Sequence, residues 1–168
     1  MNDVIERIVK QLRINNLSFT SKPIVIGGMA MEFYGIRKSG TDIDLVITDK
    51  DYKMLAQKYP EQRKDIYGDL GVVIGPFEIW RSIALLDYDF YQRQSIIQGP
   101  VGIVDIDRLL FMRVSAMEVK KYMDDLMMMK EFYYTKYRNQ EFLQEAEKHI
   151  PTYDKKNGIV FGGNYQDN

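Results

Sequence analysis

The sequence contains no cysteine and a single histidine, His149, in 168 residues. Without thiols the chain has no disulfide, no thiolate nucleophile and no Cys-ligated zinc, and one histidine excludes a multi-histidine metal site. No apolar run approaches the roughly 20 residues that a membrane-spanning helix needs. The polar, acidic N-terminus is unlike a secretory signal. We therefore expect no membrane association and a cytoplasmic location, where the absence of disulfides suits a reducing compartment.

A strong charge of either sign is also missing, because 23 Lys and Arg balance 24 Asp and Glu. No global basic field attracts nucleic acid, although the adjacent Arg37 and Lys38 form a local basic pair. The chain is 45% hydrophobic and 28% charged, which is typical of a globular protein with a sizeable core. Its length suits one domain, or a core with a small appended subdomain.

Hydrophobic periodicity predicts alternating helices and strands. We expect helices over residues 3–15, 29–34, 51–59, 105–115, 118–134 and 138–149, and strands over 24–27, 42–48, 70–74, 77–80 and 101–104. This order predicts an α+β fold, in which a small mixed β-sheet has helices on one face and a helical part at the C-terminal end.

The predicted elements divide the chain into three parts. Residues 1–104 form the core, residues 105–150 form a C-terminal helical part packed on it, and the polar, glycine-containing residues 151–168 form a flexible tail. The methionine- and tyrosine-rich C-terminal helices are suited either to a core or to a homodimer surface.

The most informative stretch joins a glycine pair, Gly27 and Gly28, to the carboxylates Asp42 and Asp44. The two aspartates are two residues apart on a predicted strand, so their side chains point to the same face. Adjacent carboxylates repel each other, and a divalent cation stabilises both as ions. Glycines at the start of a helix let a phosphate approach the backbone. The stretch therefore indicates metal-assisted phosphate chemistry.

Each half of this pattern, taken alone, is also typical of an exposed turn. A calcium-binding loop is excluded, because Val46 and Ile47 stand where its third ligand and its glycine are needed. The P-loop and the dinucleotide-binding fingerprint are excluded as well. Neither a further glycine nor Gly-Lys-Ser/Thr follows Gly27-Gly28-Met29 at the required spacing.

The combination of motifs resembles the polymerase-beta-like nucleotidyltransferase superfamily, in particular its antibiotic-nucleotidyltransferase and abortive-infection toxin branches. An apolar strand runs into Gly27-Gly28, and Asp42-Ile43-Asp44 follows with apolar residues after it. Arg37-x-Ser39 is similar to the Arg-x-Thr that precedes the aspartates in those branches. Residues 105–126, with Lys121 and Asp124, look like the helices after the last strand. The resemblance covers roughly residues 20–130.

The resemblance implies a third carboxylate on a neighbouring strand. Glu78 is the first candidate because it alternates with apolar residues in Phe77-Glu78-Ile79-Trp80, and Asp69, in a segment that we interpret as a turn, is the alternative. Asp42, Asp44 and Glu78 would be the catalytic residues and the ligands of Mg²⁺ or Mn²⁺. The nucleotide-binding residues implied by the resemblance are Gly27, Gly28, Arg37, Lys38, Ser39 and Thr41.

The implied activity transfers a nucleoside monophosphate from a nucleoside triphosphate to a hydroxyl acceptor and releases pyrophosphate. The acceptor could be a small molecule, an RNA end or a protein. The family more often has aspartate where Glu78 stands, so a second hypothesis is a catalytically weak or inactive nucleotide-binding or regulatory module, such as half of a toxin–antitoxin pair. A third is an unrelated α+β domain, in which the three carboxylates do not converge.

Overall fold

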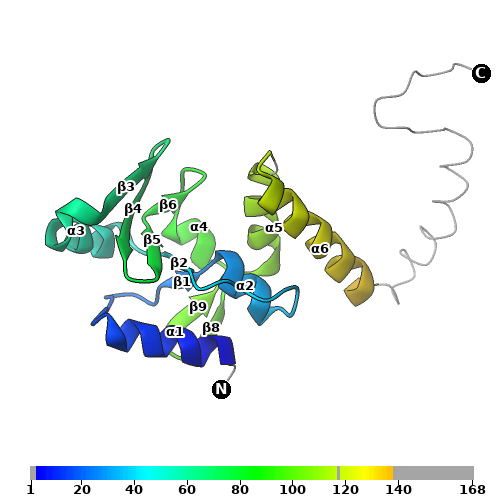
Figure 1. Cartoon of the computed structure of the whole chain (residues 1–168), viewed down its shortest axis with the longest axis horizontal. Coiled ribbons are helices and arrows are strands. Elements are labelled where there is room, and N and C mark those ends of the chain that lie inside the picture. The colour runs from blue at the N-terminus through cyan, green and yellow to red at the C-terminus, as the bar shows by residue number, and fades with distance from the viewer. Residues whose placement is uncertain (1–2, 117, 138–168) are drawn as a thin grey trace, which may run out of the picture. The chain divides into compact units, whose positions relative to one another are not determined.

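A computed structural model describes residues 3–116 and 118–137. These residues form a seven-stranded mixed sheet, a separate two-stranded sheet and surrounding helices (Figure 1). The α+β class predicted from the sequence is confirmed. The helix expected over 138–149 and the tail expected over 151–168 lie outside the described residues.

The chain divides into two compact units, residues 1–129 and 130–168. No helix in the described residues combines the length and the apolar character needed to cross a membrane. In chain order the elements are α1 (Asp3–Ile14), β1 (Ile24–Val25), α2 (Gly27–Phe33), β2 (Ile43–Val46), α3 (Asp49–Lys58), the 3-10 turn η1 (Pro60–Gln62), β3 (Arg63–Ile66), β4 (Asp69–Ile74), β5 (Phe77–Trp80), β6 (Ser82–Ile83), β7 (Leu86–Asp87), α4 (Tyr88–Gln92), β8 (Ile96–Gln98), β9 (Val101–Ile103), α5 (Ile106–Ser115) and α6 (Lys120–Tyr137).

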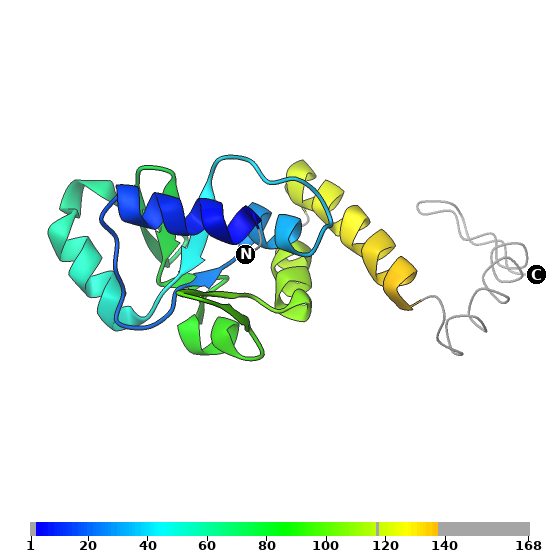
Figure 2. The ribbon, with the colours of Figure 1, turned by 90° about the horizontal axis from the view of Figure 1, so that it is seen from below.

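Helix α1 and the central strands supply much of the core of the first unit. Apolar residues recur at helical spacing along α1, and its buried residues are Val4, Ile5, Ile8 and Leu12. Figure 2 shows α1 extending across the unit, with α2 beside one of its ends. The central strands β1 and β2 are buried along almost their whole length, which is why their sequences read as nearly continuous apolar runs.

The register of the sheet places the candidate site residues on neighbouring strands. The strand order is β3-β4-β5-β2-β1-β9-β8, and β2 runs parallel to β5. Asp44 on β2 stands opposite Glu78 on β5, and Val46 stands opposite Trp80. Side chains alternate between the two faces of a strand, so Asp44, Glu78 and Trp80 share one face.

Several short elements have no clear signature in the sequence. The strand β3 (Arg63-Lys64-Asp65-Ile66) is polar because it forms one edge of the sheet, where most of its side chains are exposed. The strand β8 forms the other edge and is also largely exposed. An edge strand is paired on one side only, so it lacks the alternating apolar pattern on which our prediction relied.

The segment Gly68–Gly71, which we interpreted as a turn, was predicted wrongly in part. The turn lies at Tyr67 and Gly68, and Asp69 already begins β4. Gly71 lies within this strand, where a Cβ atom would come within 2.7 Å of Trp80 Cε3. The glycine is therefore needed for the close approach of an indole ring rather than for a change of chain direction.

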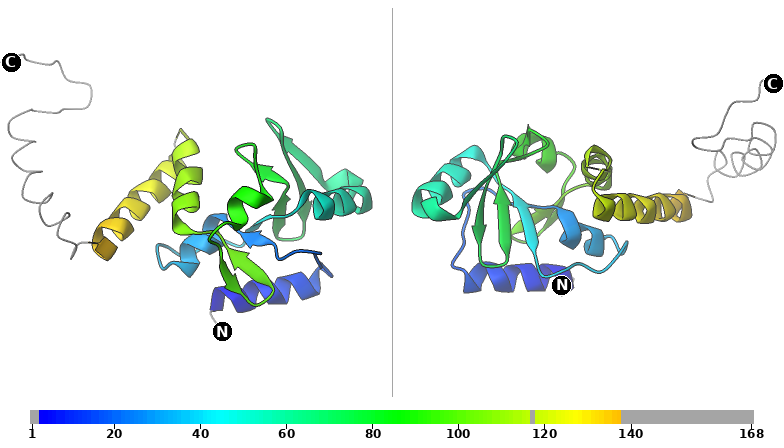
Figure 3. Two further views of the ribbon diagram at one scale, coloured as in Figure 1. Left: turned by 180° about the vertical axis from the view of Figure 1, so that it is seen from behind. Right: turned by 45° about the horizontal axis from the view of Figure 1, so that its top comes forward.

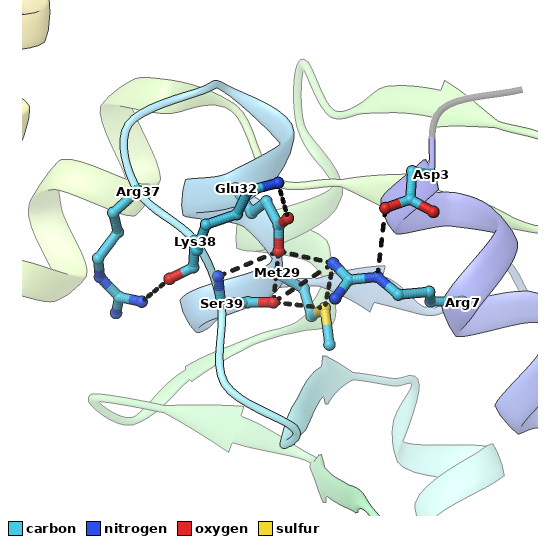
Figure 4. Close-up of polar contacts among 7 residues, drawn as sticks. All are labelled: Asp3, Arg7, Met29, Glu32, Arg37, Lys38 and Ser39. Atoms are coloured by element: carbon cyan, nitrogen blue, oxygen red, sulfur yellow. Dashed lines mark hydrogen bonds and ion pairs between the residues drawn. The ribbon is translucent and has the colours of Figure 1, made fainter.

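A buried carboxylate, Glu32 on α2, links α1 to the loop that leads into β2 (Figure 4). The Glu32 side chain is 8% exposed and accepts hydrogen bonds from Arg7 Nη2 at 2.6 Å and Lys38 Nζ at 3.0 Å. It also accepts from the Ser39 hydroxyl at 2.6 Å and the Ser39 backbone N–H at 3.0 Å. The hydrogen bond from the Ser39 hydroxyl is the largest of the effects that hold the pKa of Glu32 well below its usual range. The loop that precedes Asp42 is thereby fixed to two helices.

We predict that Glu32→Gln lowers the free energy of unfolding at pH 7 by about 2–3 kcal/mol, because partly buried donors lose a charged acceptor. A depressed carboxylate pKa stabilises the folded state above pH 4.5, the ordinary value, and this stabilisation is lost as the pH falls further. The difference between wild type and variant should therefore shrink at about pH 3. Urea unfolding at both pH values measures it, with the exposed Glu61→Gln as control. An undiminished difference at low pH would contradict the prediction.

Candidate functional site

A pocket of about 710 Å³ lies on the sheet face that carries Asp44 and Glu78. Gly27, at the start of α2, lines it beside these two carboxylates. Its walls come from β3, from the turns that follow β3 and β6, from the C-terminal end of α5 and from the N-terminal end of α6. The residues that form these walls include Lys64, Tyr67, Asp69, Trp80, Ala84, Leu85, Met112, Arg113 and Tyr122.

The predicted site residues divide between this pocket and its surroundings. Gly27, Asp44 and Glu78 line the pocket together, as predicted for a common site. Asp42 is exposed just before β2 and accepts a 3.4 Å hydrogen bond from the hydroxyl of Thr41, which is also exposed. Neither Asp42 nor Thr41 lines the pocket, although the charge of Asp42 acts on Asp44.

The backbone at Gly27 and the carboxylate of Asp44 are in close contact. Gly27 has a φ of +63°, and a Cβ atom built there would lie 2.2 Å from Asp44 Oδ2. Only glycine combines this left-handed conformation with the space that the carboxylate occupies. Gly28 is different, because its Cβ would meet Ser39 Cβ at 3.6 Å, an ordinary contact distance. The two glycines of the pair therefore have separate roles.

The start of α2 has no side-chain cap, because its N-cap residue is Ile26, which cannot accept a hydrogen bond. The first backbone N–H groups of a helix lack acceptors within the helix. Gly27 and Gly28 are the first two residues of α2, and Gly27 faces the pocket. The backbone beside Asp44 is thus chemically suited to contact oxygen atoms of a bound group.

Arg37, Lys38 and Ser39 lie outside the pocket lining, in the loop fixed by Glu32. Arg37 donates from Nη2 to Asp125 Oδ2 at 2.9 Å, and this carboxylate raises the pKa of Arg37. Lys38 and Ser39 bind Glu32 instead. These three of the predicted nucleotide-binding side chains therefore already have protein partners.

Arg113 is a pocket residue that the sequence analysis missed. Its side chain is 6% exposed, lies 2.9 Å (Nε to Oδ2) from Asp125 and sits over the Tyr122 ring at 4.8 Å from the centroid. Burial lowers its pKa, against the opposing effect of Asp125. In the sequence, Arg113 looks like an ordinary basic residue in the last turn of a helix. Its position next to the apolar Met112, on the buried side of α5, was the available signal.

Lys64 is a second missed residue, and it neutralises Glu78. Lys64 Nζ lies 3.2 Å from Glu78 Oε2 and 5.3 Å from the centroid of the Trp80 ring. The strand register explains the contact, because β3 and β5 flank β4 and place both side chains on the same face. The segment was not predicted as a strand, so nothing in the sequence brought Lys64 to this site.

Asp69, the alternative third carboxylate, has a different role. Its oxygens accept hydrogen bonds from the Ser82 hydroxyl at 2.8 Å and from the backbone N–H groups of Ala84 at 2.7 Å and Leu85 at 2.9 Å. These contacts hold the β6–β7 turn against β4. Glu78, directly opposite Asp44, is the better placed of the two candidates.

The electrostatics of the pocket centre on Asp44. Burial, and then the charge of Glu78, raises the pKa of Asp44 to about 6, with Asp42 adding to the shift and Arg113 and Lys121 opposing it. Among residues 3–116 and 118–137, no three acidic, histidine or cysteine side chains are gathered into a ready-made metal site. Asp44 and Glu78 nevertheless offer the oxygen donors that a hard divalent cation prefers, and a cation would relieve their repulsion.

We predict that Asp44→Asn raises the free energy of unfolding by about 1–3 kcal/mol at pH 7–8. The pKa of Asp44 is raised from 3.8 to about 6. Between these two pH values the folded protein keeps a proton on Asp44 that the unfolded chain has already released. Wild-type stability therefore falls as the pH rises through the window, and the variant escapes this loss. Urea unfolding at about pH 4 and pH 8 tests it: a gain of equal size at both values would contradict the assignment.

We also predict opposite effects for the two glycines. Gly27→Ala forces a side chain into the left-handed region and onto the Asp44 carboxylate, and should destabilise the fold by about 2 kcal/mol or more. Gly28→Ala adds a better helix former where there is room, and should be neutral or stabilising by up to about 1 kcal/mol. Thermal unfolding of the two variants measures both effects. Equal destabilisation by both would contradict the distinct roles.

No protein-family model matches this chain. No curated protein and no solved structure matches it either.

Proposed function

We propose that this protein is a metal-dependent nucleotidyltransferase, which moves a nucleoside monophosphate from a nucleoside triphosphate to a hydroxyl acceptor and releases pyrophosphate. The observation that carries the proposal is the placement of Asp44 directly opposite Glu78 on parallel strands, in a pocket that Gly27 also lines. Paired carboxylates beside an uncapped helix start suit the chemistry of phosphate groups.

In this proposal Asp44 and Glu78 would hold Mg²⁺ or Mn²⁺, with Asp42 close enough to add its charge. When bound, the cation supplies charge stabilisation for the oxygens around the reacting phosphorus. The backbone at Gly27 and Gly28 would contact phosphate oxygens. If Glu78 does not hold the cation, it would instead accept the proton of the attacking hydroxyl once Lys64 has moved from it. Arg113 is the buried cation in the lining that would face a bound anion.

The proposed location is the cytoplasm, where the absence of cysteine suits a reducing compartment. The proposed acceptor is a hydroxyl group of a small molecule, an RNA end or a protein. Arg37, Lys38 and Ser39 stabilise the loop before Asp42, so their contribution to nucleotide binding is proposed as indirect. A homodimer is a further proposal, for which the methionine-rich helix α6 offers exposed side chains at Met123, Met127 and Met128.

The proposal predicts that purified protein binds nucleoside triphosphates in a Mg²⁺-dependent manner and that Asp44→Asn weakens this binding by about tenfold or more, because the variant removes one charged ligand. Calorimetry measures the binding, and release of labelled pyrophosphate during incubation measures transfer. Glu61→Gln removes an exposed carboxylate from η1, outside the pocket lining, and is the matched control. Equal binding by wild type and Asp44→Asn would refute the proposal.

The same experiment separates the second candidate function, a nucleotide-binding or regulatory module without turnover. The salt bridge between Lys64 and Glu78 favours this candidate, because it neutralises the carboxylate proposed as the base. Tight, Asp44-dependent binding of a triphosphate without pyrophosphate release would support it. Restoration of transfer in Lys64→Met would instead show that the salt bridge only restrains an active site.

A further inference from the structure

The mouth of the pocket is formed by two tight turns that contact each other. One joins β3 to β4 through Tyr67 and Gly68, and the other joins β6 to β7 through Ala84 and Leu85. A Cβ atom at Gly68 would lie 3.1 Å from Leu85 Cδ2, so the turns pack closely together. In Figure 3 (left) the two hairpins stand side by side.

Both turns contain backbone strain. Tyr67, Ala84 and Leu85 have φ values of +52°, +51° and +61°, in the left-handed region that favours glycine and asparagine. Two-residue hairpin turns of this kind usually carry Asn-Gly. Among the described residues, only two other non-glycine residues have a positive φ, Asn16 and Gln94, and neither lines the pocket. The strain is thus concentrated at the mouth, where Asp69 maintains it through hydrogen bonds to the Ala84 and Leu85 N–H groups.

The strained turns expose large apolar side chains to solvent. Tyr67 is 99% exposed and Leu85 is 70% exposed, and both line the pocket. Asparagine at either position would relieve strain and remove exposed apolar surface, so the present residues stabilise neither the backbone nor the core. Strained residues that the surrounding structure holds in place are characteristic of binding sites.

Besides Tyr67, the pocket lining contains two further aromatic residues, Trp80 and Tyr122. Trp80 is 5% exposed, and Lys64 Nζ lies 5.3 Å from the centroid of its ring. The Trp80 indole lies against the backbone at Gly71, and Trp80 is two residues from Glu78 on the same face of β5.

The charges near the turns already have partners. Asp65 accepts a hydrogen bond from the Gly68 N–H at 2.8 Å, and Asp69 accepts hydrogen bonds from Ser82, Ala84 and Leu85. Lys64 is paired with Glu78. This part of the pocket therefore suits a flat, uncharged ring rather than a polyanion or a polycation.

We propose that Tyr67, Leu85 and Trp80 form a subsite for a flat, uncharged ring of the substrate. A ring held beside Trp80 places a hydroxyl substituent near Glu78, so the acceptor of the proposed transfer is the first source of the ring. The base of the nucleotide is the other source with the same chemistry. The role as acceptor site rests on the proposed function, whereas the binding of a ring does not.

Ring binding can be measured by the fluorescence of Trp80, and Gln94 offers a matched control position. Trp80 is the single tryptophan, so tryptophan fluorescence reports the occupancy of this pocket. The double variant Tyr67→Asn/Leu85→Asn removes the apolar side chains but keeps residues that accept positive φ. Gln94→Asn makes the same backbone change at a φ of +57°, outside the pocket lining. Titrations use N-acetyltyrosinamide, adenosine and the ringless N-acetylserinamide, without metal or triphosphate.

We expect saturable fluorescence changes with a ring-bearing probe and none with N-acetylserinamide. The double variant should bind the ring about tenfold more weakly, in line with the loss of stacking contacts, while its thermal stability equals or exceeds that of wild type. Gln94→Asn should bind as wild type. Binding of N-acetyltyrosinamide assigns the ring to the acceptor, and binding of adenosine alone assigns it to the nucleotide.

The inference is overturned if neither ring binds or if the double variant binds as tightly as wild type. Loss of binding accompanied by lowered stability would overturn it too, because the side chains would then serve the fold. Mg²⁺-dependent triphosphate binding is measured in parallel on the same preparations. If it persists while ring binding is absent, the subsite alone is wrong; if rings bind and triphosphates do not, the transferase proposal alone fails.

Discussion

The burial of the Asp44 carboxylate against the Gly27 backbone is the constraint around which this site is built. A carboxylate in a half-buried position is costly unless charge or hydrogen bonds compensate it. Here the neighbouring strand adds a second carboxylate, Glu78, and so increases the cost. A fold that places two acids opposite each other gains nothing in stability from the arrangement, which is the usual mark of residues kept for chemistry.

The surrounding cations balance this acidic pair in two ways. Lys64 forms a direct ion pair with Glu78 at the edge of the sheet. On the helical side, Arg37 and Arg113 share Asp125, which joins the loop before β2 to α5 and α6. The second network is largely buried, so removing one member leaves another charge without its partner. Of these residues, Lys64 and Arg113 also line the pocket, so they contribute both to its wall and to its electrostatics.

The strands nearest the centre of the sheet could be predicted from the sequence, and so could the common location of Gly27, Asp44 and Glu78, whose roles stay a prediction. Their signals are local: an apolar run, a glycine pair and acids that alternate with buried residues. Lys64 and Asp125 could not be predicted, because each matters through a partner that is distant in the sequence. The contacts of Arg37 and Ser39 were missed for the same reason. No local sequence pattern indicates that Glu32 or Asp125 is buried. For Arg113 the only local signal was its position on the buried side of α5.

The link through Glu32 has a consequence for how the molecule opens. Arg7 on α1 and Ser39 in the loop bind the same carboxylate, so detachment of α1 removes one of the charged donors that hold Glu32 beside the segment leading to Asp42 (Figure 4). Opening of α1 and loosening of this loop are therefore coupled through Glu32. Detachment of α1 would speed exchange of the Ser39 amide hydrogen, although α1 contributes no side chain to the lining of the pocket.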